Sequence, residues 1–288
     1  MTKGRVSVLV PARLEPQLVP TVRDCLKQAT GDVEVVVALD GYWPSEFVDD
    51  KRVHYLHWGA AKGLRPSLNA ARQMATGEYL FKLDGHCCLQ HGYDVALKAV
   101  CGESDVCVPA KRSLDVATWS MHREPWWYYY FLWPWQPQED GTEKFVGLQD
   151  RNYDPSMNAE LSARFGNDIL TYQGSAWMLR ATWWDKILPL GMDTRYYYAA
   201  EPVEIGLTSW VSGGRVKIVP SIEYGHLAKG QGEHKRQFAR DKRKWREAME
   251  WATKTWMSHP QFAELIDRFG PMPGWPEDWQ AEAQRRLA

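Results

Sequence analysis

Short apolar runs alternate with helical patterns through the first hundred residues. The run Val6–Val10 ends at Pro11, and similar runs occupy Val33–Leu39, Arg52–Trp58 and Tyr79–Leu83. Apolar residues at helical spacing lie between these runs, over Leu18–Ala29 and Leu64–Thr76. Strands that alternate with helices predict an α/β fold whose strands pair in parallel through right-handed crossovers.

Polar residues follow the apolar runs directly. Arg13 and Glu15 come after the first run, Asp40 after the second, and Asp84 and His86 after the fourth. Ligands bind at the carboxyl ends of the strands in parallel sheets. The pattern therefore predicts that these side chains face a common site.

The alternation is lost between Cys101 and Tyr172, where the aromatic run Trp126–Trp135 lies. We expect long loops and short strands here, inserted at the active face over residues 101–170. Regular elements are expected again over Thr171–Arg180, Ala181–Ile187, Glu201–Val211, Arg215–Val219, Ile222–His226 and Lys235–Met257. The chain is accordingly divided into residues 1–228, with that insertion, and residues 229–288, a basic helix and an irregular Trp- and Pro-rich tail packed on the first part.

Composition narrows the possible classes of protein. The 288 residues carry a formal net charge of -1, which excludes binding to nucleic acid or membranes through overall positive charge but leaves a local basic patch open. The 16 Trp residues can fill a core or line a surface that stacks on sugars and bases.

Cysteine number and hydropathy indicate where the protein resides. The five cysteines have spacings that fit neither a disulfide framework nor a zinc site, so we expect reduced thiols. The first residues lack a signal-sequence pattern, and the longest apolar stretch is too short to span a bilayer. We therefore expect a soluble cytoplasmic protein that does not enter membranes.

Three residues are candidate metal ligands. Asp84 and His86 are separated by one residue in a tight turn and can face one cation, and His226, at the end of a later strand, can supply a third ligand. Mn²⁺ or Mg²⁺ accepts such ligands. A turn without metal and a hydrogen-bonded turn histidine remain alternative interpretations.

Two segments carry a resemblance to a known family. GEYLFKLDGHC resembles the GE-x-L-x-F-L-D-S-H-C segment of the polypeptide N-acetylgalactosaminyltransferases, which are GT-A fold enzymes related to glycosyltransferase family two. The segment Tyr197–His226 resembles their W-G-G-E-N-x-E-x-x-x-R-x-W-x-C-G-G segment, which leads into V-G-H. The resemblance implies a Rossmann-like sheet flanked by helices, with Asp84, His86 and His226 holding Mn²⁺ (or Mg²⁺) against the diphosphate of a UDP-sugar.

Further segments resemble the donor site of family-two enzymes. VSVLVPARLEP resembles their first strand and uridine-pocket turn, VVVALDG the strand whose Asp binds uracil or ribose, and GLRPSLNAA the helix whose Arg contacts the nucleotide. The resemblance covers roughly residues 5–100 and 170–228. The donor-binding residues it implies are Pro11, Arg13, Glu15, Asp40, Arg65, Asn69, Asp84 and Gly85.

Glu201 and Glu204 are the candidate catalytic residues, since they lie one helical turn apart on one face. Inverting relatives usually have a Glu-Asp pair at this place, whereas this chain has Glu201-Pro202. The difference favours a retaining reaction in which Glu201 positions the acceptor or the sugar. Alternatively, Glu201 deprotonates the acceptor and gives inversion, or it only stabilises the start of a helix.

The basic run HKRQFARDKRKWR predicts either a solvated helix face or a surface that follows phosphates. The tail and the Trp content resemble phage-type glycosyltransferases, so a 5-hydroxymethylpyrimidine in DNA is the leading acceptor. Protein, glycan and small-molecule hydroxyls are alternatives, as is a non-catalytic module that binds nucleotide sugars. The sugar and the oligomeric state stay open. The candidate DNA contacts are Lys235, Arg236, Arg240, Lys242, Arg243 and Lys244.

Overall fold

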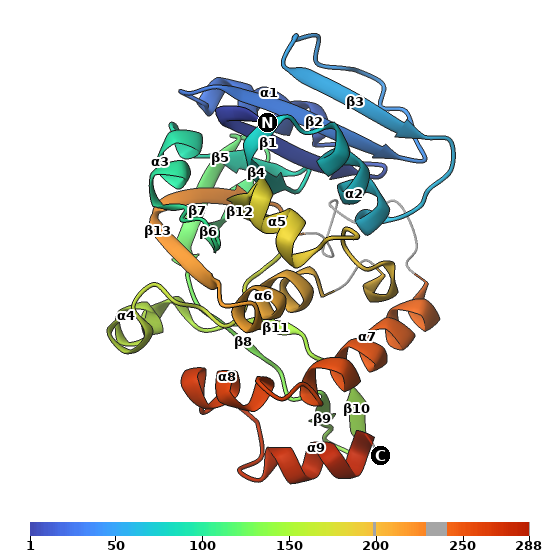
Figure 1. Cartoon of the computed structure of the whole chain (residues 1–288), viewed down its shortest axis with the longest axis vertical. Helices are drawn as coiled ribbons and strands as arrows, with labels where there is room; N and C mark the ends of the chain where they lie inside the picture. The colour runs from blue at the N-terminus through green and yellow to red at the C-terminus, as the bar shows by residue number, and fades with distance from the viewer. Residues whose placement is uncertain (198–199, 229–240, 288) are drawn as a thin grey trace.

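A large mixed sheet forms the centre of the protein (Figure 1). The computed structural model describes residues 1–197, 200–228 and 241–287. Within these residues the sheet has nine strands, in the order β3-β2-β1-β4-β12-β6-β13-β5, with β7 paired to β6. The strands are β1 (Thr2–Ala12), β2 (Val33–Asp40), β3 (Val53–Trp58), β4 (Gly77–Leu83), β5 (Cys87–Leu89), β6 (Asp105–Asp115), β7 (Ser120–Trp126), β12 (Ala176–Arg180) and β13 (Arg215–His226).

The N-terminal half of the sheet is parallel, which confirms the α/β class expected from the alternation. All residues of β2 are buried, as expected for a parallel strand covered on both faces. The other half is mixed, because β12 runs antiparallel to both β4 and β6, and β13 runs parallel to β6 but antiparallel to β5. The apolar pattern could not distinguish these directions.

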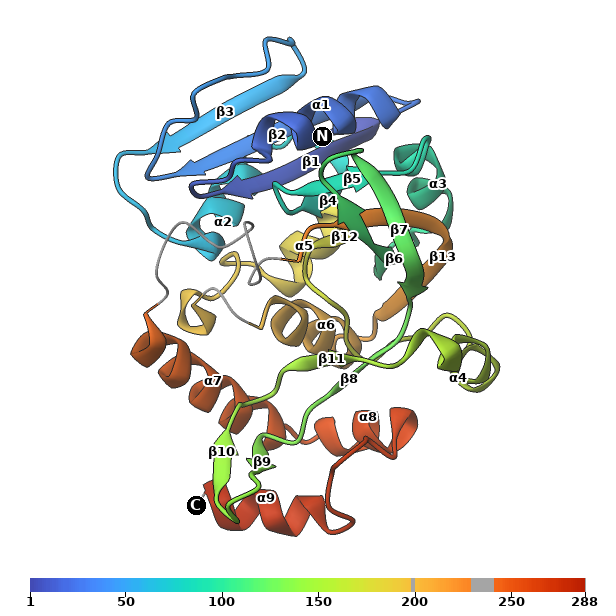
Figure 2. The same ribbon diagram turned by 180° about the vertical axis from the view of Figure 1, so that it is seen from behind.

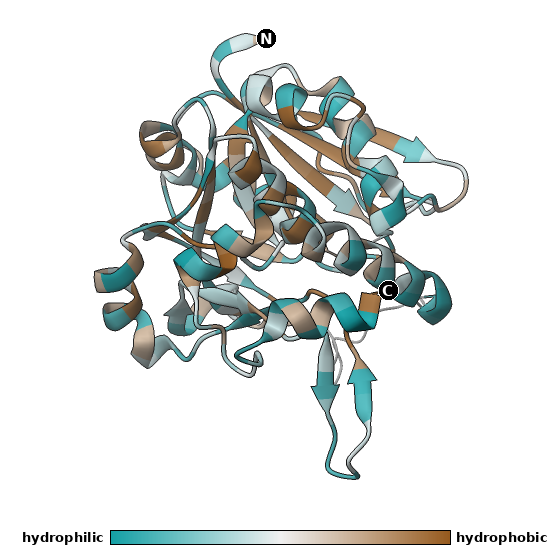
Figure 3. Cartoon of the chain, turned by 60° about the horizontal axis from the view of Figure 1, so that its bottom comes forward, coloured by the Kyte–Doolittle hydropathy of each residue, from teal (hydrophilic) through white to brown (hydrophobic). Residues whose placement is uncertain are grey.

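Helices cover both faces of the sheet. Leu9 and Val36 share one core with α2 (Leu64–Met74), α5 (Ala181–Ile187) and α6 (Glu201–Val211). Val8 and Val35, their neighbours in sequence, belong to a second core with α1 (Leu18–Gln28) and α3 (Tyr93–Val100). Successive strand side chains point to opposite faces, so the two cores lie on either side of the sheet. Figure 3 shows the apolar strands in the interior.

The segment after residue 100 differs in part from the expectation. β6 and β7 are long strands of the main sheet, where long loops and short strands were expected. Pro109 interrupts the apolar run of β6 and two cations follow it, which hid the strand from the periodicity. Short elements do follow: β8 (Tyr129–Phe131), β9 (Trp135–Pro137), β10 (Glu143–Phe145), β11 (Asp150–Asn152), the 3₁₀ helix η1 (Pro155–Met157) and α4 (Asn158–Phe165).

The C-terminal helices pack against β8–β10, as both ribbon views show (Figures 1 and 2). They are α7 (Lys242–Met257), α8 (Phe262–Phe269) and α9 (Trp279–Leu287). α7 confirms the C-terminal part of the expected Lys235–Met257 helix, whose first residues lie outside the described ones. Residues 271–278 contain no helix or strand, as expected. No helix in the described ranges is long and apolar enough to cross a bilayer.

Aromatic rings join these helices to the β9–β10 hairpin. We call Trp133, Trp135, Phe262, Trp275 and Trp279 the C-terminal aromatic cluster. The Trp275 indole N–H donates to the Phe131 carbonyl over 2.7 Å. Four of the 16 Trp residues therefore pack together in this region, with Trp133 buried and the other three partly buried.

Candidate functional site

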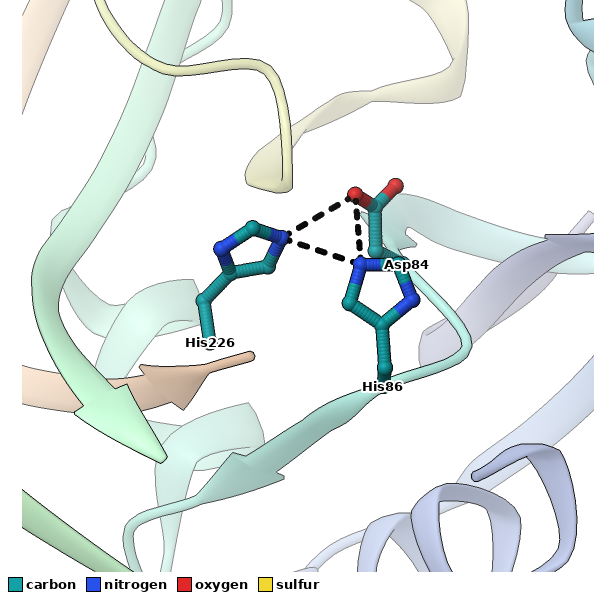
Figure 4. Close-up of side chains that lie close together, drawn as sticks. All are labelled: Asp84, His86 and His226. Carbon is teal, nitrogen blue, oxygen red and sulfur yellow. Dashed lines mark hydrogen bonds and ion pairs between the residues drawn. The ribbon is translucent and has the colours of Figure 1, made fainter. Parts of the chain in front are cut away.

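Asp84, His86 and His226 converge at one edge of the central sheet (Figure 4). Asp84 directly follows β4, His86 directly precedes β5, and His226 is the last residue of β13. β13 pairs antiparallel with β5, which sets His226 opposite Cys87. The two histidine Nε2 atoms are 3.1 Å apart, and Asp84 Oδ2 lies 3.4 Å from that of His226 and 3.6 Å from that of His86. The predicted ligands are thus brought together.

Glu15 orients one of these histidines. Its Oε2 atom lies 2.8 Å from Nδ1 of His86. A carboxylate at this distance favours the tautomer in which Nδ1–H donates to Glu15, leaving the Nε2 lone pair directed at Asp84 and His226. One carboxylate oxygen and two imidazole nitrogens within 4.8 Å of one another fit a divalent cation.

Lys82 is a buried cation that contacts two carboxylates of the site. Its buried ammonium group lies 2.6 Å from Asp84 Oδ1 and 3.4 Å from Glu201 Oε2, and it also donates to the Gly174 carbonyl. Burial alone would raise the pKa of Asp84, but Lys82 and the two histidines outweigh it and lower that pKa. Burial lowers the pKa of His226 to about 4, so this imidazole is neutral at pH 7 and its lone pair is available.

Glu201 begins α6 and is buried beside Lys82. Its Oε1 accepts a hydrogen bond from the Trp177 indole over 3.1 Å, and burial raises the pKa of its carboxyl. The loop before β12 passes close by, since a Cβ atom added at Gly174 would lie 3.4 Å from that of Glu201. The carbonyl of Ser175, the residue directly after Gly174, accepts a hydrogen bond from the Asp84 amide over 2.8 Å. This loop thus links Glu201 to Asp84.

Glu204 faces a different partner. It forms a buried ion pair with Arg65 of α2 and accepts the Asp193 amide over 2.6 Å. Burial raises the pKa of Glu204 to about 7, although Arg65 opposes the shift. The Arg65 guanidinium also lies 4.8 Å above the Tyr196 ring. The two predicted catalytic glutamates are therefore one turn apart, but only Glu201 contacts a residue next to the metal ligands.

Three predicted donor-binding residues have partners within the chain. Asp40 accepts the Lys62 amide over 2.5 Å and the Gly63 amide over 3.1 Å, at the start of α2. Asn69 holds the Met192 backbone through two hydrogen bonds of 2.7 and 3.0 Å. Arg65 is fully buried against Glu204. Each of the three side chains is therefore engaged within the chain, and direct donor contact stays a prediction for all three.

Of the other predicted donor residues, Pro11, Arg13 and Glu15 lie at the carboxyl end of β1, and Gly85 follows β4. Pro11 and Arg13 are partly buried. Gly85 packs closely on Glu15, since an added Cβ would come within 3.0 Å of the Glu15 Cγ atom. A side chain at residue 85 would therefore disturb the carboxylate that orients His86.

Sequence reasoning missed several polar residues near the triad, namely Lys82, Lys111, Asp150, Ser175 and Tyr224. Lys82 had a detectable signal, because it is the charged residue inside the apolar run Tyr79–Leu83. Ser175 and Tyr224 share a buried hydrogen bond of 2.6 Å, and neither stands out by position or spacing.

Only some of the predicted DNA-binding cations lie among the described residues. Lys235, Arg236 and Arg240 lie outside the described residues. Lys242, Arg243 and Lys244 are exposed in the first turn of α7, where Asp241 caps the helix through the backbone amides of residues 243 and 244. Arg243 and Glu247 lie 3.2 Å apart along the helix, which fits the solvated-face interpretation for that residue.

Comparisons with known proteins identify relatives. A family model described as "Glycosyl transferase family 2" matches residues 7–181. A crystal structure of GalNAc-T7 with UDP, GalNAc and Mn²⁺ superposes with a TM-score of 0.60 at 15% identity, covering 97% of this chain and 51% of that one. The chain thus spans about half the length of that protein. S. aureus TarS 1–349 in complex with UDP-GlcNAc superposes at 0.59 with 13% identity, covering 92% and 70%. No curated protein matches the sequence.

Proposed function

The chain belongs to glycosyl transferase family 2 and is a glycosyltransferase with a GT-A fold, and we propose that it transfers a sugar from a UDP-sugar to a hydroxyl group with the help of a divalent cation. The cluster of Asp84, His86 and His226 carries this proposal, because its three ligand atoms lie within 4.8 Å of one another. The relatives support the choice of donor, since GalNAc-T7 binds UDP and Mn²⁺ and TarS binds UDP-GlcNAc.

The charges around the cluster support a bound cation. Among the described residues, three carboxylates (Glu15, Asp84 and Glu201) and one basic side chain (Lys82) form the buried or half-buried network that includes the triad. With the carboxylates ionised, this network has an excess of two negative charges, which a divalent cation balances. A divalent cation bound there would neutralise the negative charge that develops on the departing diphosphate.

Neighbouring side chains orient the ligand atoms of this site. Lys82 holds Oδ1 of Asp84, so that Oδ2 faces the two histidines. Glu15 fixes the imidazole of His86 with Nε2 directed at the cluster. The donor would lie at the carboxyl ends of β1 and β4, against Pro11, Arg13 and the start of α2, where ligands bind in such sheets.

The proposed stereochemistry is retention. Residue 202 is a proline and has no carboxylate, and the two carboxylate oxygens of Glu201 already contact Lys82 and Trp177. We therefore assign Glu201 to positioning the sugar or the acceptor. NMR of the product formed from a UDP-α-sugar tests this: an α-linked product supports retention, and a β-linked product overturns it.

The proposed acceptor is a 5-hydroxymethylpyrimidine in DNA. The exposed Lys242, Arg243 and Lys244 at the start of α7 support it, because cations on one exposed turn can contact phosphates. We expect duplex binding that weakens steeply with salt and falls at least about tenfold in the Arg243→Glu, Lys244→Glu double variant. Absence of duplex binding at low salt overturns this acceptor and favours a glycan, protein or small-molecule hydroxyl.

The reaction itself is tested by UDP release from several UDP-sugars with Mn²⁺, with and without hydroxymethylated duplex DNA. Chelation by EDTA should abolish release, and added Mn²⁺ should restore it. Asp84→Ala should lose at least about a hundredfold in rate, whereas Asp49→Ala, an exposed aspartate, should retain full activity. Unchanged release in EDTA or in Asp84→Ala would contradict metal dependence.

A further inference from the structure

A second group of polar side chains lies beside the triad on the same face of the sheet. In the parallel pairing of β6 with β13, Lys111 is opposite Tyr224 and Ser113 is opposite His226. Directly paired residues point to the same face, so Lys111 and His226 share a face. Trp126 of β7 is the partner of Lys111 on its other side. The surface that carries the metal ligands thus continues across Lys111 to Trp126.

The ammonium group of Lys111 has aromatic neighbours but no hydrogen-bond acceptor among the described residues. It lies 4.8 Å from the centre of the Trp126 ring and 5.8 Å from that of Tyr129. Burial lowers the pKa of Lys111, and its charge helps to lower the pKa of His226. Lys111 therefore lies within electrostatic reach of the metal ligands, and its donor hydrogens are unused.

Asp150 faces Lys111 from the inserted segment. It belongs to β11, which pairs with β8 next to α6, as Figure 2 shows. Among the residues the structure describes, no other residue donates a hydrogen bond to its carboxylate. Burial raises the pKa of Asp150 to about 6, against its own backbone amide and the charge of Lys111. A partly buried carboxylate that accepts only from its own backbone amide keeps acceptor capacity for a ligand or water.

Three buried hydroxyl groups around Asp150 also lack partners in the described part of the chain: Tyr129 OH, Thr171 Oγ1 and Tyr172 OH. An isolated bridge joins Tyr129 to Thr171, and Tyr172 is the next residue of the chain. The negative charge of Asp150 raises the pKa of both Tyr129 and Tyr172, and the charge of Glu201 also raises the pKa of Tyr172. Asp150 is thus electrostatically coupled to Lys111 and to Tyr172, and Tyr172 is also coupled to Glu201.

Lys111 and Asp150 are partly buried and have unused hydrogen-bonding capacity. Together with the buried, unpartnered hydroxyl groups and the aromatic rings, they describe a binding site for a neutral hydroxyl-bearing group. We propose that Lys111 and Asp150, with Trp126, Tyr129 and Tyr172, form the acceptor subsite, in which Asp150 accepts a hydrogen bond from the acceptor hydroxyl and Lys111 donates to an oxygen of the same group. This inference rests on the proposed glycosyl transfer and names the residues that select its acceptor. Asp150 binds the acceptor without taking its proton, so the subsite is compatible with retention.

The test separates acceptor binding from donor chemistry. Asp150→Asn and Lys111→Met are compared with Asp140→Asn and Lys144→Met, which alter exposed residues of the same insertion. Two rates are measured with Mn²⁺. The first is the release of UDP from the UDP-sugar without an acceptor. The second is transfer to an acceptor, either hydroxymethylcytosine duplex or methyl glucoside, whichever the wild type glycosylates. UDP binding and melting temperature are recorded for each variant to establish folding.

We expect acceptor KM to rise at least about tenfold in both site variants, with UDP binding and acceptor-free UDP release within about twofold of wild type. The two control variants should behave as wild type. Equal transfer by Asp150→Asn and wild type overturns the subsite, and so does a parallel loss of acceptor-free release and UDP binding, which would place the residues on the donor side. A wild type that releases no UDP from any UDP-sugar refutes the proposed function itself.

Discussion

His86 Nδ1 and Glu15 Oε2 lie 2.8 Å apart, although 71 residues separate them in the chain. This contact selects the imidazole tautomer whose Nε2 atom faces Asp84 and His226. Glu15 was implied as a donor-binding residue, and the structure gives it a contact with a candidate metal ligand. A carboxylate behind a ligating histidine both orients the ring and raises its basicity.

Glu15→Ala should therefore weaken Mn²⁺ binding by about 10- to 100-fold. Glu15→Gln should lose less, because its amide oxygen can still accept from Nδ1. Titration of Mn²⁺ by electron paramagnetic resonance measures both, with Glu46→Gln, an exposed glutamate, as the control. Equal Mn²⁺ affinity in the wild type and Glu15→Ala would show that His86 does not depend on this carboxylate.

Lys82→Met should destabilise the fold by about 3–5 kcal/mol, because it leaves the Asp84 and Glu201 carboxylates without their buried cation. Urea denaturation gives the free energy of unfolding, and Lys51→Met, at an exposed position, should differ little from wild type. Mn²⁺ should raise the melting temperature more in Lys82→Met than in wild type, since it replaces part of the missing charge. A variant as stable as wild type without metal would contradict the buried network.

Glu204 predicts a specific pH dependence of stability. Its pKa is raised from 4.5 in the unfolded chain to about 7 by burial, with Arg65, Asp193 and Glu201 as the charged groups that face it. Its stabilising contribution is complete below pH 4.5 and is lost as the pH rises through 7. In that window the free energy of unfolding should fall by up to about 1.4 kcal/mol per pH unit.

Glu204→Gln should remove this slope, so the stability difference between wild type and variant should shrink or reverse from pH 4.5 to 7.5. Denaturation curves at four pH values measure it, with Glu247→Gln on the exposed face of α7 as the control. Parallel pH profiles for wild type and Glu204→Gln would mean that Glu204 is ionised throughout this range.

Trp133 tests the packing role of the C-terminal aromatic cluster. It is 4% exposed and lies 5.2 Å, ring to ring, from both Trp135 and Trp275. Trp133→Ala should cost about 3–5 kcal/mol of stability. Trp43→Ala, at a ring that is 63% exposed, should cost less than about 1 kcal/mol. Similar melting temperatures for the two variants would contradict this assignment.

Periodicity alone predicted the α/β class and most elements of the first hundred residues, because buried parallel strands and amphipathic helices leave local patterns. It failed at β6, where Pro109 breaks the apolar run, and at the strand directions of β12 and β13. The direction of a strand depends on where the connecting segments cross the sheet. A local hydrophobic pattern contains no information about these crossings. The Asp84–His86 pair was within reach of sequence reasoning because one turn holds both residues.

The sequence by itself indicated which apolar runs form the buried strands and which polar residues follow them. Only the tertiary structure decided which buried charges meet. Arg65 and Glu204 are 139 residues apart, and the pairing of Lys82 with Asp84 and Glu201 depends on α6 starting beside β4. Lys111 and Asp150 are brought together for the same reason: the sheet order sets β6 beside β13, and the charge of Asp150 in β11 acts on Lys111. Burial makes an unmatched charge costly, so the fold, and not local spacing, selects the partners that form the site.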